Sequence, residues 1–159
     1  MTAIRTGLGW DNHRIAEGRP LIIGGITVPC EFGLEGHSDA DVLLHALTDA
    51  LLGALALGDI GVHFPDTDPR WKGASSGQFL THAMGLVRER GWTIANVDTT
   101  VVLQRPKLKD FREPMRANIA RLLEVELDRV SVKFKTAEGV GPVGEGQSGE
   151  AQALVTLVR

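Results

Sequence analysis

The sequence of 159 residues contains one cysteine, no apolar run long enough to span a bilayer, and no long apolar segment at its N-terminus. The single Cys30 excludes an intrachain disulfide. Without a spanning or signal-like segment, the sequence predicts neither a membrane protein nor a secreted one, and we expect a cytoplasmic location. It also lacks repeats and low-complexity tracts. We therefore expect one domain over residues 1–159, without a linker.

An excess of positive charge is also missing. Lys and Arg number 17 against 20 Asp and Glu, which gives a formal net charge of -3. This balance argues against an extended nucleic-acid surface but leaves room for a local anion pocket. Hydrophobic residues make up 43% and charged residues 23%, which is close to ordinary globular usage and indicates neither disorder nor a membrane protein. Small polyanions remain possible substrates.

What is present is a mixture of strand and helix patterns. Alternating or short apolar runs predict strands at residues 4–10, 21–28 (a hairpin), 97–103, 130–134 and 151–158. Apolar residues at helical spacing predict helices at residues 38–57 and 75–90, and a third that begins near Asp110. Gly, Pro and Asp residues predict an irregular loop at residues 59–73. The mixture predicts an α+β fold (an α/β sandwich), with one mixed β-sheet and helices packed on one face.

The first predicted helix, at residues 38–57, is apolar nearly all round, so we expect it to be buried. Ser38 is a suitable N-cap, and Asp41 completes a capping box. The exception is one polar stripe in which Asp41, His45 and Thr48 share a face at spacings of four and three. A buried carboxylate and a buried imidazole both need partners.

The first predicted strand indicates a close contact and a metal site. Gly7 and Gly9 indicate that another element approaches this strand closely. Asp11 and His13 are two residues apart at its end, so their side chains can point to the same side. With His45 they would supply one carboxylate and two imidazoles, a set that leaves a fourth zinc position open. The alternative interpretation is an N-terminal turn and an unrelated buried histidine.

Two other patterns invite a nucleotide interpretation. The glycines of residues 139–144 match the dinucleotide fingerprint, but Pro142 lies inside it and a strand follows, so we reject a nicotinamide site. Basic residues gather before and within the third helix, namely Arg105, Lys107, Lys109, Arg112 and Arg116. This cluster is either a solvated face or a phosphate or nucleotide site at a helix N-terminus.

Taken together, the motifs resemble the family of 2-C-methyl-D-erythritol 2,4-cyclodiphosphate synthases over most of the chain. The matching motifs are Asp11-x-His13, residues 37–41 with His45, residues 49–53, 58–61, 64–68 and 96–98, and Gln104-x-Pro106-Lys107. The resemblance implies a lyase of non-mevalonate isoprenoid biosynthesis. Such an enzyme cyclises 4-diphosphocytidyl-2-C-methyl-D-erythritol 2-phosphate, a small cytidine diphosphate substrate, and releases CMP. It also implies a homotrimer with its sheets around the three-fold axis and active sites between subunits, with no nucleic acid or membrane as partner.

The resemblance also implies roles for single residues. Asp11, His13 and His45 correspond to ligands of zinc or another divalent transition metal, and Glu138 to the ligand of Mg²⁺ or Mn²⁺ bound with the diphosphate, a division that fits their donor atoms. His37 and Thr136 correspond to catalytic positions that hold the phosphates. The substrate-binding positions are Asp11, His13, His37, Ser38, Asp59, Ile60, Gly61, Phe64, Pro65, Asp66, Thr67, Asp68, Leu103, Pro106, Lys107, Leu108, Lys109, Lys135, Thr136, Ala137 and Glu138.

The chain departs from the family pattern near its end. The family's consecutive threonines become residues 135–138, Lys-Thr-Ala-Glu, and its later Phe-x-Gly-Arg-x-Glu-Gly becomes residues 142–146 without the arginine. In the family that arginine faces a cavity on the trimer axis. Two alternative functions remain beside the cyclase. They are a metal-dependent phosphoanhydride hydrolase and a non-catalytic trimeric metal-binding scaffold.

Overall fold

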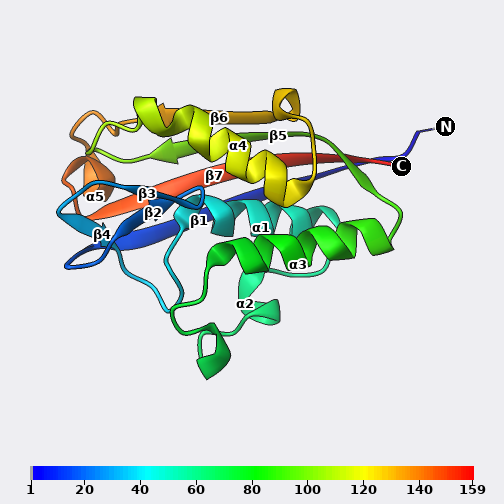
Figure 1. The fold of residues 1–159 in the computed structure, drawn as a ribbon, viewed down its shortest axis with the longest axis horizontal. Helices are drawn as coiled ribbons and strands as arrows, with labels where there is room; N and C mark the ends of the chain where they lie inside the picture. The colour runs from blue at the N-terminus through cyan, green and yellow to red at the C-terminus, as the bar shows by residue number, and fades with distance from the viewer. Residues whose placement is uncertain (1) are drawn as a thin grey trace.

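The computed structural model describes residues 2–159 (Figure 1). The strands are β1 (Ile4–Glu17), β2 (Leu21–Ile23), β3 (Ile26–Val28), β4 (Phe32–Leu34), β5 (Thr93–Val102), β6 (Val130–Lys135) and β7 (Ser148–Val158). The α-helices are α1 (Val42–Ala54), α2 (Ile60–His63), α3 (Ser76–Glu89), α4 (Arg112–Leu123) and α5 (Gly141–Gly144). Short 3-10 helices are η1 (Pro69–Trp71), η2 (Lys109–Phe111) and η3 (Leu127–Arg129).

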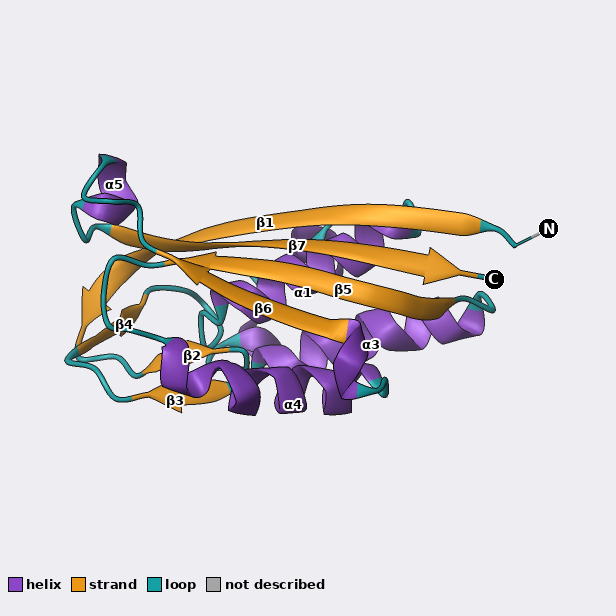
Figure 2. Cartoon of the chain, turned by 90° about the horizontal axis from the view of Figure 1, so that it is seen from above, coloured by secondary structure: helices purple, strands orange, loops and turns teal. Residues whose placement is uncertain are grey.

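The main sheet has five strands in the order β4-β1-β7-β5-β6, and β2 and β3 form a separate hairpin. β5 and β6 run parallel, whereas the other neighbours are antiparallel, so the sheet is mixed. The three long helices, α1, α3 and α4, lie on one face of it (Figure 2). This confirms the predicted fold class of one mixed sheet with helices on one face. Within residues 2–159, no helix is long and apolar enough to cross a membrane.

Helix α1 is pressed directly against β1, as the two glycines predicted. A Cβ built on Gly7 would lie 1.9 Å from the carbonyl oxygen of Ala50, and one on Gly9 would lie 1.8 Å from that of Ala46. Only a residue without a side chain allows the helix backbone to come so near. Because alternate strand residues share a face, Asp11 and His13 continue the face of these glycines beyond the closest contact. This contact brings His45, next to Ala46, toward the end of β1.

The prediction that α1 begins at Ser38 is wrong. The helix begins at Val42, and Asp41 is its N-cap, whose carboxylate accepts from the amide of Leu44 at 3.0 Å. Ala40 has a φ of 57°, which no residue inside a right-handed helix adopts. Asp41 is fully buried and also accepts from the amides of the glycine turn at residues 24–25. Burial raises the pKa of Asp41 to about 6, although these backbone donors oppose the shift.

Other boundaries also differ from the prediction. β1 extends to Glu17 because β7, which begins at Ser148, pairs with it as far as Arg14 and β4 pairs with it from Ile15 to Glu17. The segment 59–73 is not wholly irregular, since it contains the short α2 and η1. The glycines of residues 139–144 enter one helical turn, α5, and then β7. A dinucleotide fingerprint must open a long helix, so its rejection agrees with the structure.

Candidate metal and substrate site

Asp11, His13 and His45 converge at one point, where β1 leaves the contact with α1. The Oδ2 atom of Asp11 lies 2.8 Å from Nε2 of His13 and 3.0 Å from Nδ1 of His45. The two ring nitrogens are 3.1 Å apart. Within residues 2–159, Asp11, His13 and His45 form the one group of at least three His, Cys, Asp or Glu side chains whose ligand atoms are close enough to share a metal ion. The structure therefore supports the predicted triad over the interpretation of an unrelated buried histidine.

The donor atoms of this triad fit a metal ion. Nδ1 of His13 lies 2.6 Å from the carbonyl oxygen of Glu35, and a carbonyl can only accept, so this nitrogen carries the proton. The lone pair of His13 is then on Nε2, which faces Asp11. Ligands of a tetrahedral zinc ion at about 2.0–2.1 Å stand roughly 3.3 Å apart. The observed separations are slightly shorter, so a small outward movement of the side chains would accommodate the ion.

The charges of the triad are strongly coupled. Burial opposes ionisation of Asp11, but hydrogen bonds and charges from His13 and His45 outweigh it and hold the pKa of Asp11 well below its usual range. Burial would likewise lower the pKa of His13, but the hydrogen bond and charge of Asp11 outweigh it and raise that pKa. The carboxylate thus stays ionised, and a cation is favoured beside it.

The triad lines a cavity of about 450 Å³, which we call the first cavity. Its lining is Asp11, His13, Gly36, His37, Ser38, His45, Ile60, Gly61, Phe64, Pro65, Asp66, Trp71 and Phe79. Of the predicted erythritol phosphate positions, three are not in this lining, namely Asp59, Thr67 and Asp68. Asp59 caps α2 through the amide of Val62 at 3.0 Å. Asp68 pairs with Arg70, and its carbonyl accepts from Nε2 of His37 at 3.1 Å.

The outer wall of the first cavity is held by aromatic side chains. The ring of Phe64 lies 4.4 Å from that of Phe79 on α3 and stands edge-on to Trp71 at 5.1 Å between centroids. Nε1 of Trp71 is buried without a hydrogen-bond partner. Aromatic packing of this kind positions the segment after α1 over the triad and limits the access of water.

A second cavity, of about 220 Å³, forms around the predicted cytidine segment. Its lining is Leu103, Pro106, Lys107, Leu108, Lys109, Arg112, Phe134, Lys135 and Thr136. Four cations therefore surround it, and the ion pairs of residues 2–159 include none of them. Arg105 and Arg116 of the predicted basic cluster instead pair with Glu31 and Glu113. The cluster thus divides into an ion-paired part and a part that suits an anion.

The predicted magnesium ligand belongs to neither lining. Glu138 follows β6 and has a φ of 53°. Its Oε1 accepts from the hydroxyl of Thr136 at 3.0 Å, and its amide lies 3.3 Å from the same hydroxyl. This small turn holds the Glu138 carboxylate beside Thr136, at the rim of the second cavity. Ala137 lies within the turn and lines neither cavity.

Several residues at the site were not predicted from the sequence. Gly36, Trp71 and Phe79 line the first cavity, and Phe134 lines the second. The aromatic residues could have been suspected from their place beside predicted loops. Ser76 also contacts His45, through the ring nitrogen Nε2 on the side away from Asp11. Ser76 was interpreted only as part of a helix start, and no spacing rule connects it with a histidine 31 residues earlier.

Known proteins resemble this chain along nearly its whole length. The model of the YgbB family matches residues 4–158. The 2-C-methyl-D-erythritol 2,4-cyclodiphosphate synthase of Solibacter usitatus is 69% identical over 99% of this chain and 99% of that protein. The bifunctional IspDF of Campylobacter jejuni has a TM-score of 0.95 and 44% identity, covering 99% of this chain and 43% of that one. The structure of a 2C-methyl-D-erythritol-2,4-cyclodiphosphate synthase in a form bound to CDP has a TM-score of 0.89 and 45% identity. The match covers 96% of this chain and 99% of that one.

Proposed function

Because this chain belongs to the YgbB family, whose relatives above are 2-C-methyl-D-erythritol 2,4-cyclodiphosphate synthases, we propose that it catalyses the same cyclisation. It converts 4-diphosphocytidyl-2-C-methyl-D-erythritol 2-phosphate into the 2,4-cyclodiphosphate and CMP, as a lyase of non-mevalonate isoprenoid biosynthesis. The observation that carries the proposal is the convergence of Asp11, His13 and His45 at the mouth of the first cavity. A single domain over residues 1–159 and a cytoplasmic location are part of the same proposal.

The metals of the proposal follow from the donor atoms. Asp11, His13 and His45 offer two nitrogens and one oxygen and would hold zinc or another divalent transition metal. Glu138 offers oxygen alone and would hold Mg²⁺ or Mn²⁺ together with the diphosphate. The bound cations would supply Lewis acidity and neutralise charge that develops on the phosphoryl oxygens.

The chain's own side chains then position the substrate. No side-chain nucleophile is needed, because the 2-phosphate of the substrate attacks the β-phosphorus and CMP leaves with the bonding electron pair. Of the residues that line the first cavity, His37 holds the phosphates together with Thr136, and Ser38 holds the erythritol phosphate, with the chain of α2 and Phe64 closing over it. Thr136 donates to phosphate oxygens, and Lys107 and Lys109 balance their charge. Holding the attacking oxygen and the phosphorus in line is the main contribution of the protein.

The homotrimer is supported by the outer face of the sheet. Leu8, Trp10 and Leu154 are 70%, 55% and 46% exposed, and they point away from the helices. Leu8 and Leu154 face each other across the β1–β7 pair. An apolar strip on a bare sheet face is typical of a subunit contact. Sheets of three subunits packed around an axis would cover this strip and would bring a second cavity of one subunit toward the first cavity of its neighbour.

Product analysis tests the proposed function. Incubation with the diphosphocytidyl substrate, Zn²⁺ and Mg²⁺, followed by mass spectrometry, should give CMP and the cyclic diphosphate. A hydrolase would release CMP and an open 2,4-bisphosphate, which is heavier than the cyclic diphosphate by one water. A scaffold would release nothing. Phosphorus NMR of the product provides a second measurement, because the two phosphorus atoms of the cyclic diphosphate share a bridging oxygen and couple to each other, whereas those of the open bisphosphate do not.

A further inference from the structure

The far side of the His45 ring carries a chain of hydrogen bonds that the proposed function does not use. Nε2 of His45 lies 2.7 Å from the hydroxyl oxygen of Ser76. That hydroxyl in turn makes a short hydrogen bond with Oδ1 of Asp39. Ser76 is fully buried and His45 is 8% exposed, so water does not compete for these bonds. The three side chains come from α1, from the start of α3 and from the turn before α1.

The direction of each hydrogen bond follows from the chemistry of Asp39. An ionised carboxylate can only accept, so the Ser76 hydroxyl donates its single proton to Asp39. The Ser76 oxygen is then left as an acceptor toward Nε2 of His45. Nε2 must therefore carry the ring proton, and the lone pair of His45 is placed on Nδ1, which faces Asp11. The hydroxyl of Ser38, at 3.1 Å from Nε2, can accept from the same proton but is farther away.

Backbone hydrogen bonds hold the Asp39 carboxylate in place to accept from the Ser76 hydroxyl. The amide of Asp39 donates to the carbonyl of Ala74 at 3.0 Å, and its Oδ2 accepts from the amide of Ser76 at 3.0 Å. Its Oδ1 also accepts from the amide of Asp41 at 3.1 Å. The carboxylate thus ties the turn before α1 to the start of α3 and at the same time orients the Ser76 hydroxyl. Oriented outer hydrogen bonds of this kind commonly select the tautomer of a metal-binding histidine.

We propose that Asp39 and Ser76 form a positioning relay that fixes His45 as its Nε2–H tautomer and so prepares Nδ1 to bind the metal. The inference rests on the proposed metal site. His13 and His45 differ in this respect, because a backbone carbonyl orients His13 whereas two side chains orient His45. Only the His45 half of the site can therefore be changed by mutation without altering a ligand.

The test measures zinc affinity with a competing chromophoric chelator. Asp39→Asn should lower the affinity about 10-fold to 100-fold, the usual range for loss of an outer hydrogen-bond partner. The asparagine amide can donate to Ser76, whose proton is then directed at Nε2 and moves the ring proton to Nδ1. Ser76→Ala should lower the affinity less, because Nε2–H keeps the Ser38 hydroxyl. In the Ser76→Ala background, Asp39→Asn should add little, since the relay is already broken.

A charge-matched control separates the relay from electrostatics. Asp49 is close enough to Asp11 and His45 to interact with both, but its carboxylate accepts from the amide of Ile60 at 2.7 Å instead of orienting a histidine. Asp49→Asn therefore removes one nearby negative charge and leaves the relay intact. It should lower the zinc affinity less than Asp39→Asn does. Equal losses in the two variants would attribute the whole effect to charge and would overturn the proposal.

Nitrogen NMR of the His45 ring provides a readout that a purely structural role would not move. In the zinc-loaded wild type, Nε2 should carry the proton, and its resonance should shift in Ser76→Ala while the fold is kept. A proton on Nδ1, or zinc bound through Nε2, would contradict the relay directly, without any variant. If the wild type binds no zinc and His45→Ala changes nothing, the proposed metal site itself fails. If the wild type binds zinc and His45→Ala loses it, but Asp39→Asn retains the wild-type affinity, only the relay fails.

Discussion

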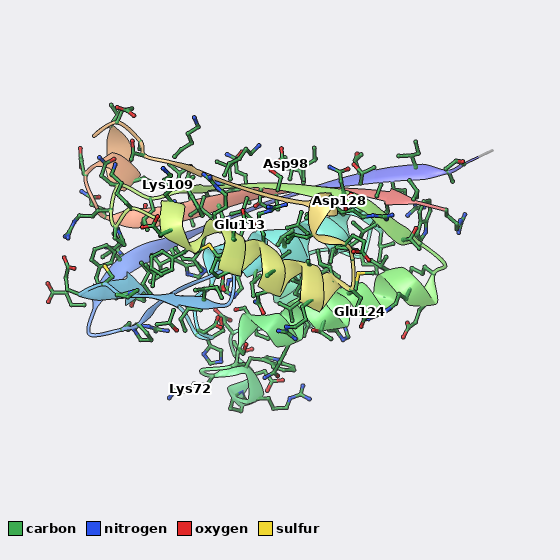
Figure 3. The ribbon with its side chains drawn as sticks, turned by 45° about the horizontal axis from the view of Figure 1, so that its top comes forward. Lys72, Asp98, Lys109, Glu113, Glu124 and Asp128 are labelled. Atoms are coloured by element: carbon green, nitrogen blue, oxygen red, sulfur yellow. The ribbon has the colours of Figure 1, made fainter. Side chains whose placement is uncertain are left out.

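The first and second cavities are built in different ways. The first lies where α1 is packed against β1, and its candidate metal ligands are buried or half-buried, with their ligand atoms within 4.8 Å of one another. The second is lined mainly by residues that follow β5 and by the end of β6, and within residues 2–159 its cations have no ion-pair partner. Figure 3 shows Lys72, next to the wall of the first cavity, and Lys109, in the second, well apart. No residue lines both cavities.

The first cavity is therefore preformed in a single chain, whereas the second, without a metal triad beside it, is only half of the proposed site. Core packing fixes the first cavity, so a single folded chain can hold a metal there. Four cations line the second cavity, which favours an anionic ligand there, and the proposed reaction would place that ligand beside a metal triad. The triad of the same chain does not adjoin it. A neighbouring subunit would supply the missing half, and the bare apolar strip of Leu8, Trp10 and Leu154 is where such a subunit would pack.

The largest effect should come from breaking the packing that builds the first cavity. Gly9→Ala places a methyl group 1.8 Å from the carbonyl oxygen of Ala46, and neither backbone can yield without moving α1. We expect the free energy of unfolding to fall by about 3 kcal/mol or more, and the affinity for zinc to fall with it. Urea unfolding and zinc titration measure the two effects.

Gly85→Ala is the matched control for this substitution. Gly85 is a helical residue of α3 with no atom within 4 Å of its added Cβ, so the same change should stabilise the protein by about 0.5–1 kcal/mol. If Gly9→Ala were as stable as Gly85→Ala, the close contact of α1 with β1 would not be what positions the triad.

A second pair of variants sharpens the division between the two metals. His45→Ala removes a proposed zinc ligand but leaves the apolar faces of α1 packed, so the protein should fold and lose stoichiometric zinc. Glu138→Gln should keep zinc and lose turnover through weaker magnesium binding, with partial recovery at high Mg²⁺. Metal analysis of the purified variants and activity assays at graded Mg²⁺ distinguish these outcomes. Loss of zinc from Glu138→Gln would mean that the two sites are exchanged.

The third prediction tests whether two subunits complete each site. His45→Ala disables the first cavity, and Lys107→Glu disables the second by reversing a charge beside the diphosphate. Each variant alone should be nearly inactive. In randomly mixed trimers, about a quarter of the interfaces should pair two intact halves, because each half is intact with a probability of about one half. Co-expression with different tags, purification of mixed trimers and activity assays measure the recovery. Verified mixed trimers as inactive as their parents would contradict the shared site.

The sequence was a good guide to the first cavity and a poor one to the second. Gly7, Gly9, Asp11 and His13 alternate along one strand, and a period of two is a local property that fixes a shared face. The helical stripe containing His45 is local in the same sense. Their meeting could be predicted because glycine in a strand indicates a close neighbour, and the structure shows that the neighbour is α1.

The second cavity has no such local signal. Lys107 and Lys135 come from segments joined only by the pairing of β5 with β6, and a basic cluster alone does not separate a solvated face from a ligand site. Family resemblance, not periodicity, identified these positions. The start of α1 was mispredicted for a related reason. Ser38 has the chemistry of an N-cap, but Ala40 has a positive φ and the residues on either side of it, Asp39 and Asp41, make contacts that are distant in sequence, with Ser76 and with the glycine turn at residues 24–25.

The smallest expected effect is a pH dependence of the stability that zinc confers. Asp11 raises the pKa of His13 against the effect of burial, so the metal-free fold retains a proton that the unfolded chain loses near pH 6.5. This proton stabilises the metal-free fold below the unfolded pKa, and the contribution is lost as the pH rises through the raised, folded pKa. Zinc competes with the proton for Nε2 of His13, so zinc should raise the unfolding temperature more at about pH 8 than at about pH 6.

Comparing zinc-loaded with chelated protein at each pH isolates this proton from other titrations. Asp41, whose pKa burial raises to about 6, titrates in both forms and cancels in the difference. Asp11 keeps its low pKa and stays ionised throughout the window, so it adds no pH dependence of its own. His82→Gln, which changes an exposed histidine of α3 outside the triad, should preserve the pH dependence. A zinc-induced rise in unfolding temperature that is equal at both pH values would mean that His13 does not exchange its proton for the metal, and the first cavity would then hold its cation without that ligand.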